Sequence, residues 1–233
     1  MHEQHKIPQH IGIIMDGNRR WAKEHKLKAV WQGHEAGART LENVLTWCKE
    51  LGVQEVTLYA LSLENFNRPQ EEVAKLMEIT RKEFKQLLTK EKQDYRIRII
   101  GRTQEYPTDI QELMQQLIKQ TAEKGPYTVN FAMAYDGRAE IVDAVKKIAE
   151  DVRTGEISIK DINEKTIEQR LYSASQPDLI IRTSGEQRIS GFLLWQASYA
   201  ELYFSPKMWP EFKREDLVAA ITTYSERKRR FGK

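Results

Sequence analysis

The sequence predicts an α/β fold built on a single, mostly parallel six-stranded sheet with helices on both faces. Short apolar runs alternate along the whole chain with segments whose apolar residues recur at helical spacing. This alternation is typical of parallel sheets with helical crossovers. The 233 residues are 40% hydrophobic and 30% charged, and no repeat or flexible linker divides them. We therefore expect residues 1–233 to form one domain around one core.

Six apolar runs are expected to be the strands, because each is short and several are rich in β-branched or aromatic residues. They cover residues 11–15, 56–61, 96–100, 128–134, 179–181 and 202–204. Most are continuous rather than alternating, which indicates strands covered on both faces.

Helices are expected between these runs, where apolar residues lie three and four apart and would face a core. The stripes are Leu41, Val44, Leu45 and Cys48; Ile110, Leu113, Met114, Leu117 and Ile118; Ile141, Val145, Ile148 and Val152; and Leu217, Val218, Ile221 and Tyr224. Gly52 stands where a glycine ends a helix, and Thr108-Asp109 after Pro107 is a candidate N-cap. The polar stretch 155–169 predicts a surface insertion with a short helix after Asp161.

Composition excludes several classes of protein. A net charge of +3 is too small to indicate nucleic-acid binding. Cys48 is the only cysteine, so neither a disulfide framework nor a cysteine zinc site is expected, in keeping with a reducing cytoplasm. Residues 1–9 are polar and no 18-residue apolar stretch occurs, so we expect neither a signal peptide nor a membrane span.

The end of the first run carries the most informative polar cluster. Asp16, Gly17, Arg19 and Arg20 directly follow the apolar residues 11–15. The turn after a parallel strand is where open sheets hold ligands, and one carboxylate beside two guanidiniums suggests a metal–diphosphate site. The alternative is an ordinary strand-to-helix turn with Asp16 as the helix N-cap.

Two further strand ends carry polar clusters, at residues 62–69 and 182–190. Because the carboxyl ends of parallel strands share one edge, the three clusters are expected to meet in one crevice. There the guanidiniums of Arg20, Arg68, Arg182 and Arg188 would outnumber the carboxylates of Asp16, Glu64 and Glu186. Such an excess predicts an anionic ligand such as a diphosphate.

The common nucleotide and hydrolase motifs are absent. The sequence has no Gly-x-x-x-x-Gly-Lys loop, no Gly-x-Gly-x-x-Gly fingerprint and no Gly-x-Ser-x-Gly elbow, and its five histidines fall within the first 34 residues. Neither a nucleotide-binding protein nor a serine hydrolase is indicated.

Four segments resemble the signature regions of the cis-prenyltransferases, the family of undecaprenyl diphosphate synthase. They are DGNRRWA (16–22), GHEAG (33–37), SLENFNRP (62–69) and IRTSGEQRISGFLLWQASYAELYF (181–204). The aspartate-rich DDxxD motif of the all-helical trans-type synthases is absent. The resemblance implies an Mg²⁺-dependent enzyme that adds isopentenyl diphosphate to an allylic diphosphate such as farnesyl diphosphate, each addition creating a Z double bond.

The same resemblance implies the site residues. Asp16 would hold Mg²⁺ and assist loss of diphosphate, Asn65 would take part in catalysis, and Glu201 would be a second metal ligand. A surface ion pair is the alternative for Glu201, and a surface position is the alternative for His34. The substrate-binding residues would be Gly17, Asn18, Arg19, Arg20, Trp21 and His34 for the allylic diphosphate; Ser62, Leu63, Glu64, Phe66 and Arg68 in the closing loop; and Arg182, Arg188, Ile189 and Ser190 for isopentenyl diphosphate.

The chain departs from the family pattern at several positions. Many bacterial members have Gly in place of Arg19, Trp in place of Phe66 and His in place of Gln187. The family arginine before the Gly-His pair has no clear match, and Lys26 and Lys28 are both candidates.

An apolar product implies a tunnel, expected beneath a helix over residues 71–88 with Val73, Leu76, Met77 and Phe84. The alternative for each of these residues is ordinary helix–sheet core. The expected product is undecaprenyl diphosphate; a short-chain Z-farnesyl synthase, a longer dolichol-type synthase and a non-catalytic stabilising subunit are the alternatives.

The resemblance also implies a homodimeric cytoplasmic enzyme that hands its product to a membrane. Its Arg230-Phe231-Gly232 tail would complete the partner's isopentenyl diphosphate site. The alternative for this tail is a cationic helix end that complements the helix dipole.

Overall fold

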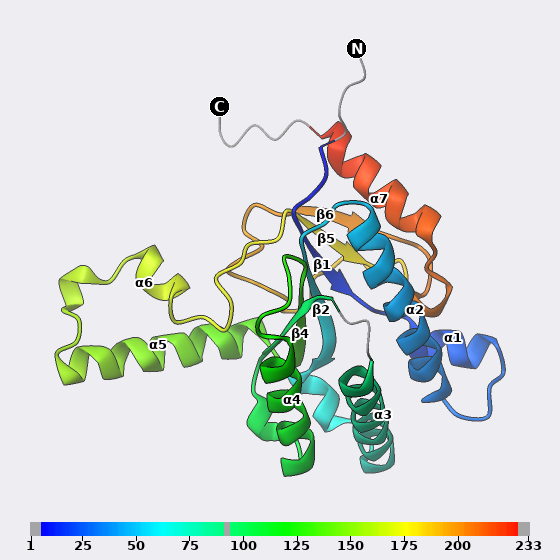
Figure 1. The fold of residues 1–233 in the computed structure, drawn as a ribbon, viewed down its shortest axis with the longest axis horizontal. Coiled ribbons are helices and arrows are strands. Elements are labelled where there is room, and N and C mark those ends of the chain that lie inside the picture. The colour runs from blue at the N-terminus through cyan, green and yellow to red at the C-terminus, as the bar shows by residue number, and fades with distance from the viewer. Residues whose placement is uncertain (1–5, 91–93, 228–233) are drawn as a thin grey trace.

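The computed structural model describes residues 6–90 and 94–227. Its centre is one sheet in which six parallel strands follow the order β3-β4-β2-β1-β5-β6 (Figure 1). The strands are β1 (His10–Ile14), β2 (Glu55–Ser62), β3 (Arg96–Ile100), β4 (Thr128–Tyr135), β5 (Leu179–Arg182) and β6 (Glu201–Phe204). All six expected strands are confirmed, and the sheet is wholly parallel in the described part of the chain.

Burial follows the position of each strand in the sheet. Every residue of the inner strands β1 and β5 is buried, whereas no residue of the edge strand β6 is. Continuous apolar runs are what strands covered on both faces require. Strands β4, β2, β1 and β5 are parallel neighbours. Their carboxyl ends therefore lie side by side at one end of the sheet.

Seven α-helices occur in the described ranges. They are α1 (Asn18–Glu24), α2 (Gln32–Glu50), α3 (Gln70–Thr89), α4 (Thr108–Thr121), α5 (Gly137–Thr154), α6 (Glu164–Glu168) and α7 (Arg214–Glu226). Short 3₁₀ turns lie at Leu63–Asn67, Thr103–Glu105, Ile159–Asp161 and Trp209–Glu211. The expected short helix after Asp161 is confirmed as α6, and the expected helix over 71–88 as α3.

The two faces of the sheet are covered differently. Helices α2, α3, α4 and α7 contribute to one apolar core on one face, with Val44, Leu76, Leu117 and Leu217 among its buried members. A smaller apolar cluster, which includes Phe192, covers the other face. The segment between β5 and β6, which contributes Phe192 and Leu193, therefore packs on this second face of the sheet.

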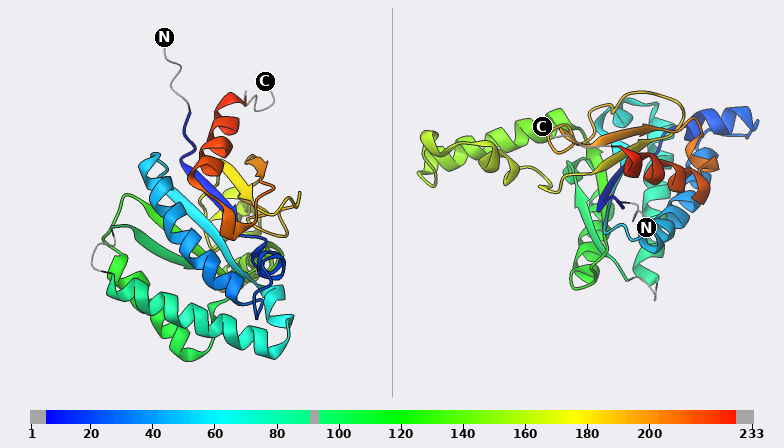
Figure 2. Two further views of the ribbon diagram at one scale, coloured as in Figure 1. Left: turned by 90° about the vertical axis from the view of Figure 1, so that its right-hand side faces the viewer. Right: turned by 90° about the horizontal axis from the view of Figure 1, so that it is seen from above.

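Helix α5 differs from the expectation. With α6 it extends away from the sheet (Figures 1 and 2), and Val145, expected to face a core, is 53% exposed. Ile118 of α4 is likewise 39% exposed. The expectation for these two residues is wrong, because helical spacing reveals an apolar stripe without showing whether the chain covers all of it.

Helix ends were predictable only in part. Gly52 follows α2 with a positive φ of 86°, as expected of a helix-ending glycine. The N-cap expectation for Thr108 is wrong: α4 starts at Thr108 itself, Pro107 precedes it, and no side chain caps this end. Pro107 occupies the N-cap position, and its carbonyl oxygen accepts hydrogen bonds from the N–H groups of Ile110 and Gln111 at 3.0 and 3.1 Å.

Candidate active site

The strand ends of β4, β2, β1 and β5 border one cavity of about 1110 Å³. The three polar clusters expected to converge, around Asp16, Ser62 and Arg182, all line it. A shared edge of a parallel sheet brings together loops that are far apart in the sequence. This cavity is therefore the candidate active site.

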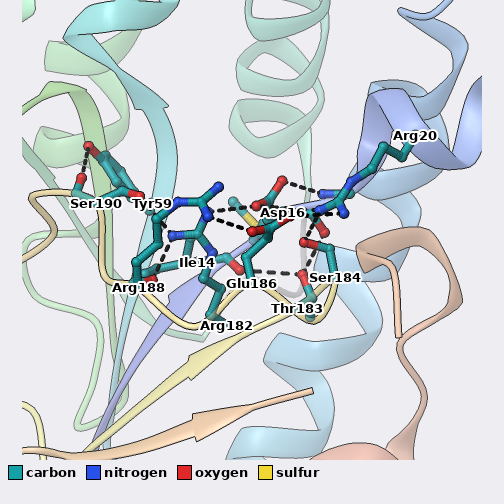
Figure 3. Close-up of polar contacts among 12 residues, drawn as sticks. Ile14, Asp16, Arg20, Tyr59, Arg182, Thr183, Ser184, Glu186, Arg188 and Ser190 are labelled. Atoms are coloured by element: carbon teal, nitrogen blue, oxygen red, sulfur yellow. Dashed lines mark hydrogen bonds and ion pairs between the residues drawn. The ribbon is translucent and has the colours of Figure 1, made fainter. Parts of the chain in front are cut away.

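Asp16 occupies the turn between β1 and α1, facing Arg182 on one side and Arg20 on the other (Figure 3). Its Oδ1 accepts a hydrogen bond from the Gly17 N–H, and its Oδ2 accepts one from Arg182 Nη2, each at 2.7 Å. Partial burial by itself raises the pKa of the Asp16 carboxyl, but the hydrogen bond and charge of Arg182 outweigh it and hold the pKa below its ordinary value. Asp16 is therefore ionised at neutral pH.

The alternative role of Asp16 as a helix N-cap does not hold. Gly17 occupies the N-cap position of α1, and no side chain caps this helix. Gly17 has a φ of 107°, and a Cβ there would lie 3.0 Å from that of Met208. Glycine is needed at this turn, and the Asp16 carboxylate is left to face the cavity.

Three carboxylates are each shared by two guanidiniums at the cavity. Asp16 pairs with Arg182 at 2.7 Å and with Arg20 at 3.8 Å. Glu186 pairs with Arg188 at 2.5 Å and with Arg20 at 3.1 Å. Glu72 pairs with Arg68 at 3.0 Å and with Arg19 at 3.3 Å. These five arginines and three carboxylates leave an excess of positive charge. An anion with several oxygens, such as a diphosphate, is the ligand that this arrangement favours.

Glu72 is a member of this network that the sequence analysis missed. Its side chain is 8% exposed, although it lies in the first turn of α3. Glu64, which was expected to balance the arginines, lines the cavity without an ion pair among the described residues. The available signal for Glu72 was its position one helical turn after Arg68.

Arg182 also organises the turn that carries Ser190. Its side chain is only 5% exposed, and Nη1 donates hydrogen bonds to the carbonyl oxygen of Arg188 at 2.6 Å and to Ser190 Oγ at 2.8 Å. The Tyr59 hydroxyl donates to the Ser190 carbonyl oxygen at 3.3 Å. Tyr59, also missed by the sequence analysis, thus joins β2 to this turn.

The glycines of the Gly-His-Glu-Ala-Gly segment let α1 and α2 approach each other. A Cβ on either Gly33 or Gly37 would collide with Asn18. Between them, His34 lines the cavity in the first turn of α2. Burial lowers its pKa to about 4, and the positive charges of Arg68 and Arg19 contribute. We infer a neutral imidazole at pH 7.

The loop after β2 places its polar residues at the cavity and its apolar residues elsewhere. Asn65 Oδ1 accepts a hydrogen bond from the Ser62 N–H at 3.0 Å, which fixes the amide at the cavity wall. Leu63 packs against the main core. The Phe66 ring meets Tyr106 edge-on at 5.4 Å between centroids.

Most of the expected site residues lie around the cavity. Those that line it are Asp16, Gly17, Asn18, Arg19, Arg20, His34, Ser62, Glu64, Asn65, Arg68, Arg182, Arg188 and Ser190. Trp21, whose ring contacts that of His25 at 4.3 Å between centroids, lies outside the lining, as do Leu63, Phe66 and Ile189. Gln187, Lys26 and Lys28 are exposed and do not line it either.

Glu201 lies at the amino-terminal end of the parallel strands, whereas Asp16 follows their carboxyl end. Glu201 begins β6 and pairs in register with Leu179, the first residue of β5, whereas the site follows the last residue, Arg182. Its carboxylate forms an ion pair with Arg227 at 2.5 Å. Within one chain the structure therefore does not bring Glu201 and Asp16 together.

The cavity continues from the charged strand ends into an apolar region between α2 and α3. Its apolar lining there is Leu41, Leu61, Leu76, Ile79, Phe84, Leu87, Phe131 and Met133. Of the four residues expected along a tunnel, Leu76 and Phe84 line it, whereas Val73 and Met77 pack into the core. Glu42 and Glu83 add two carboxyls to this wall, and burial raises the pKa of Glu83.

Two further expectations concern other parts of the chain. Arg230, Phe231 and Gly232 lie outside the described residues. Within residues 6–90 and 94–227, no helix combines the length and the apolar character needed to cross a membrane.

The chain is similar to known proteins over nearly its whole length. A family model described as putative undecaprenyl diphosphate synthase matches residues 14–232. A tritrans,polycis-undecaprenyl-diphosphate synthase (geranylgeranyl-diphosphate specific) of Methanocaldococcus jannaschii is 47% identical, the match covering 99% of this chain and 85% of that protein. An isoprenyl transferase of Thermotoga maritima is 44% identical, with 97% of both chains covered.

A solved structure shows the same fold. Lavandulyl diphosphate synthase from Lavandula x intermedia, crystallised with dimethylallyl diphosphate, aligns with a TM-score of 0.92 and 37% identity, over 97% of this chain and 99% of that one. The resemblance found in the four sequence segments is thus confirmed over nearly the whole length. The chain belongs to the cis-prenyltransferase family of undecaprenyl diphosphate synthases, and it is a polyprenyl diphosphate synthase.

Proposed function

We propose that this enzyme uses Mg²⁺ to add isopentenyl diphosphate units to an allylic diphosphate, forming undecaprenyl diphosphate. The observation that carries this proposal is the two-part cavity, cationic around Asp16 and apolar between α2 and α3. A prenyl diphosphate has the same division into an anionic head and an apolar chain. The primer that we propose is geranylgeranyl diphosphate, since the Methanocaldococcus relative is specific for it; farnesyl diphosphate is the alternative.

The residues present fit Mg²⁺ together with a diphosphate. Mg²⁺ prefers oxygen ligands and is commonly held by one or two carboxylates plus substrate phosphates. Asp16 supplies one ionised carboxylate, and no group of three metal-binding side chains occurs in the described residues, so phosphate oxygens would complete the set. The bound ion would stabilise negative charge on the leaving diphosphate. A metal role for Glu201 would require a second chain to bring it to the cavity.

The remaining cavity residues divide into two groups. Asn18, Arg19, Arg20 and His34 would hold the allylic diphosphate, while Arg182, Arg188 and Ser190 would hold isopentenyl diphosphate. His34 would do so as a neutral hydrogen-bonding group. Asn65, whose side-chain amide is fixed at the cavity wall by the Ser62 N–H, would act in removal of the proton from isopentenyl diphosphate.

Kinetics of two arginine variants can test this division. Arg188→Ala should raise KM for isopentenyl diphosphate about tenfold, because one charge-assisted hydrogen bond is lost. Arg20→Ala should raise KM for the allylic substrate by a similar factor. If both variants raised the same constant equally, the two-site assignment would be wrong.

Product length offers a separate test of the apolar region. Phe84→Ala should lengthen the product, because the Phe84 ring is 4% exposed and forms part of the cavity wall. The matched control is Met77→Ala on the same helix, which is buried in the core but does not line the cavity. It should lower thermal stability without changing chain length, as analysed by chromatography of the dephosphorylated products. Equal product lengths for wild type, Phe84→Ala and Met77→Ala would place the growing chain elsewhere.

A homodimer is also part of the proposal. Val142 and Val145 are 48% and 53% exposed on α5, which extends away from the sheet. Exposed apolar residues on a projecting helix favour burial against a second copy. Sedimentation of the full chain tests this, and a fully active monomer would contradict it.

The decisive experiment incubates the full chain with isopentenyl diphosphate, Mg²⁺ and, in separate reactions, geranylgeranyl or farnesyl diphosphate. We expect Z-polyprenyl products with geranylgeranyl diphosphate and their loss when Mg²⁺ is chelated. Products of very different length would reassign the enzyme to a short-chain or dolichol-type synthase. No turnover with any allylic diphosphate would favour a stabilising subunit.

A further inference from the structure

A fourth strand end borders the cavity, beyond the three that the sequence pointed out. Strand β4 ends at Tyr135, and the next residues are Asp136, Gly137 and Arg138, the last two opening helix α5. Asp136 and Arg138 both line the cavity. The proposed function gives neither of them a role.

The start of α5 is fixed against the turn that carries Ser190. The Gly137 N–H donates a hydrogen bond to the Gly191 carbonyl oxygen at 2.9 Å, and a Cβ on Gly137 would collide with that oxygen. The Tyr59 hydroxyl also reaches both segments: it lies 3.3 Å from the carbonyl oxygens of Tyr135 and Ser190 and can donate its one proton to either. Arg138 therefore lies on the side of the cavity formed by the Ser190 turn.

Arg138 differs from the other arginines of the cavity, because no carboxylate in residues 6–90 or 94–227 pairs with it. The other five lining arginines each pair with Asp16, Glu72 or Glu186. Arg138 forms no ion pair or hydrogen bond with the described residues, and its side chain is exposed. The neighbouring Asp136 acts instead as the N-cap of α5, its Oδ1 accepting a hydrogen bond from the Ala139 N–H at 2.8 Å.

Local electrostatics favour an anion at this position. The Asp136 carboxylate caps the N-terminus of α5 and offsets its partial positive charge, so the positive charge offered to an anion here is that of the Arg138 guanidinium. Exposed arginines usually find a carboxylate or remain in open solvent. A free guanidinium on the wall of a cavity, at a rigid helix start, is instead placed to meet an incoming phosphate.

We propose that Arg138 is a further substrate-binding residue, which contacts the diphosphate of isopentenyl diphosphate beside Arg188 and Ser190. The inference rests on the proposed function, since it assigns one of its two substrates to the Ser190 side of the cavity. Arg138 touches no reacting carbon in this arrangement, so its loss affects binding of isopentenyl diphosphate more than the chemical step.

The test compares Arg138→Ala with Arg153→Ala, a matched control in the last turn of the same helix. Arg153 is exposed and pairs only with Glu150 among the described residues. Steady-state kinetics should show KM for isopentenyl diphosphate raised about tenfold in Arg138→Ala, with kcat and the allylic KM nearly unchanged, whereas Arg153→Ala should match wild type. Equal constants for the two variants, or a change confined to the allylic KM, would overturn the proposal.

Binding of inorganic pyrophosphate by calorimetry separates this inference from the proposed function. Arg138→Ala should bind pyrophosphate several-fold more weakly than Arg153→Ala, whether or not the enzyme turns over a given allylic substrate. The difference should persist at 0.3 M KCl, because a direct contact is screened less than a distant charge. A difference that vanished at this salt concentration would show that Arg138 contributes only a general field and would refute the contact.

Discussion

Asp16→Ala is expected to lower kcat/KM by at least about a thousandfold, corresponding to roughly 4 kcal/mol of barrier. The reason is that Asp16 is the ionised carboxylate in the centre of the arginines, where a metal-bound diphosphate would leave. The fold should persist, because Arg182 keeps its hydrogen bonds to Arg188 and Ser190. Steady-state kinetics at saturating Mg²⁺, with circular dichroism for the fold, measure both effects.

The matched control for Asp16 is Glu186→Ala. Glu186 also lies between two arginines, and its side chain is 32% exposed against 31% for Asp16. Its removal should lower kcat/KM by less than about tenfold, since Glu186 pairs with Arg20 and Arg188 but is not a proposed metal ligand. If Asp16→Ala kept more than a tenth of wild-type activity, or if both variants were equally impaired, Asp16 would not be the metal ligand.

Arg182→Ala is expected to damage both activity and stability. The Arg182 side chain is 5% exposed, and its removal leaves the Asp16 carboxylate, which is 31% exposed, without its nearest ion-pair partner. The variant also releases the Ser190 turn from two hydrogen bonds. We expect a loss of at least about a hundredfold in kcat/KM for isopentenyl diphosphate, together with a lower urea midpoint.

The pH dependence of this variant gives an independent readout. The folded-state pKa of Asp16 is depressed below 3.8, so its ionised pairing stabilises the fold above that pH and is lost as the pH falls through the lower folded value. Without Arg182 the pKa of Asp16 should rise, and the acid limb of the activity profile should move to higher pH. Arg188→Ala, which removes a side chain that is 59% exposed, should leave both stability and the acid limb unchanged. A similar acid limb in Arg182→Ala and wild type would mean that Arg182 does not control Asp16.

Secondary structure was predictable because it depends on local patterns. Continuous apolar runs placed all six strands, and helical spacing placed α2, α4, α5 and α7. The same patterns could not foresee that Val145 would be exposed, because a stripe of apolar residues does not reveal what covers it. Nor could they show that Pro107, rather than Thr108, would occupy the N-cap position of α4.

The sequence by itself determined the strand ends that carry Asp16, Ser62 and Arg182, since motif and strand lie in one continuous stretch. Only the tertiary structure decided which side chains meet. It pairs Glu72 with Arg19 and Arg68, and it links Tyr59 to the Ser190 turn. It also places Glu201 at the opposite end of the parallel strands from Asp16. These relations depend on strand order and helix packing, which juxtapose residues that are distant in the chain. No local pattern of residues encodes such distances, because side chains at separate strand ends interact only after the sheet has formed.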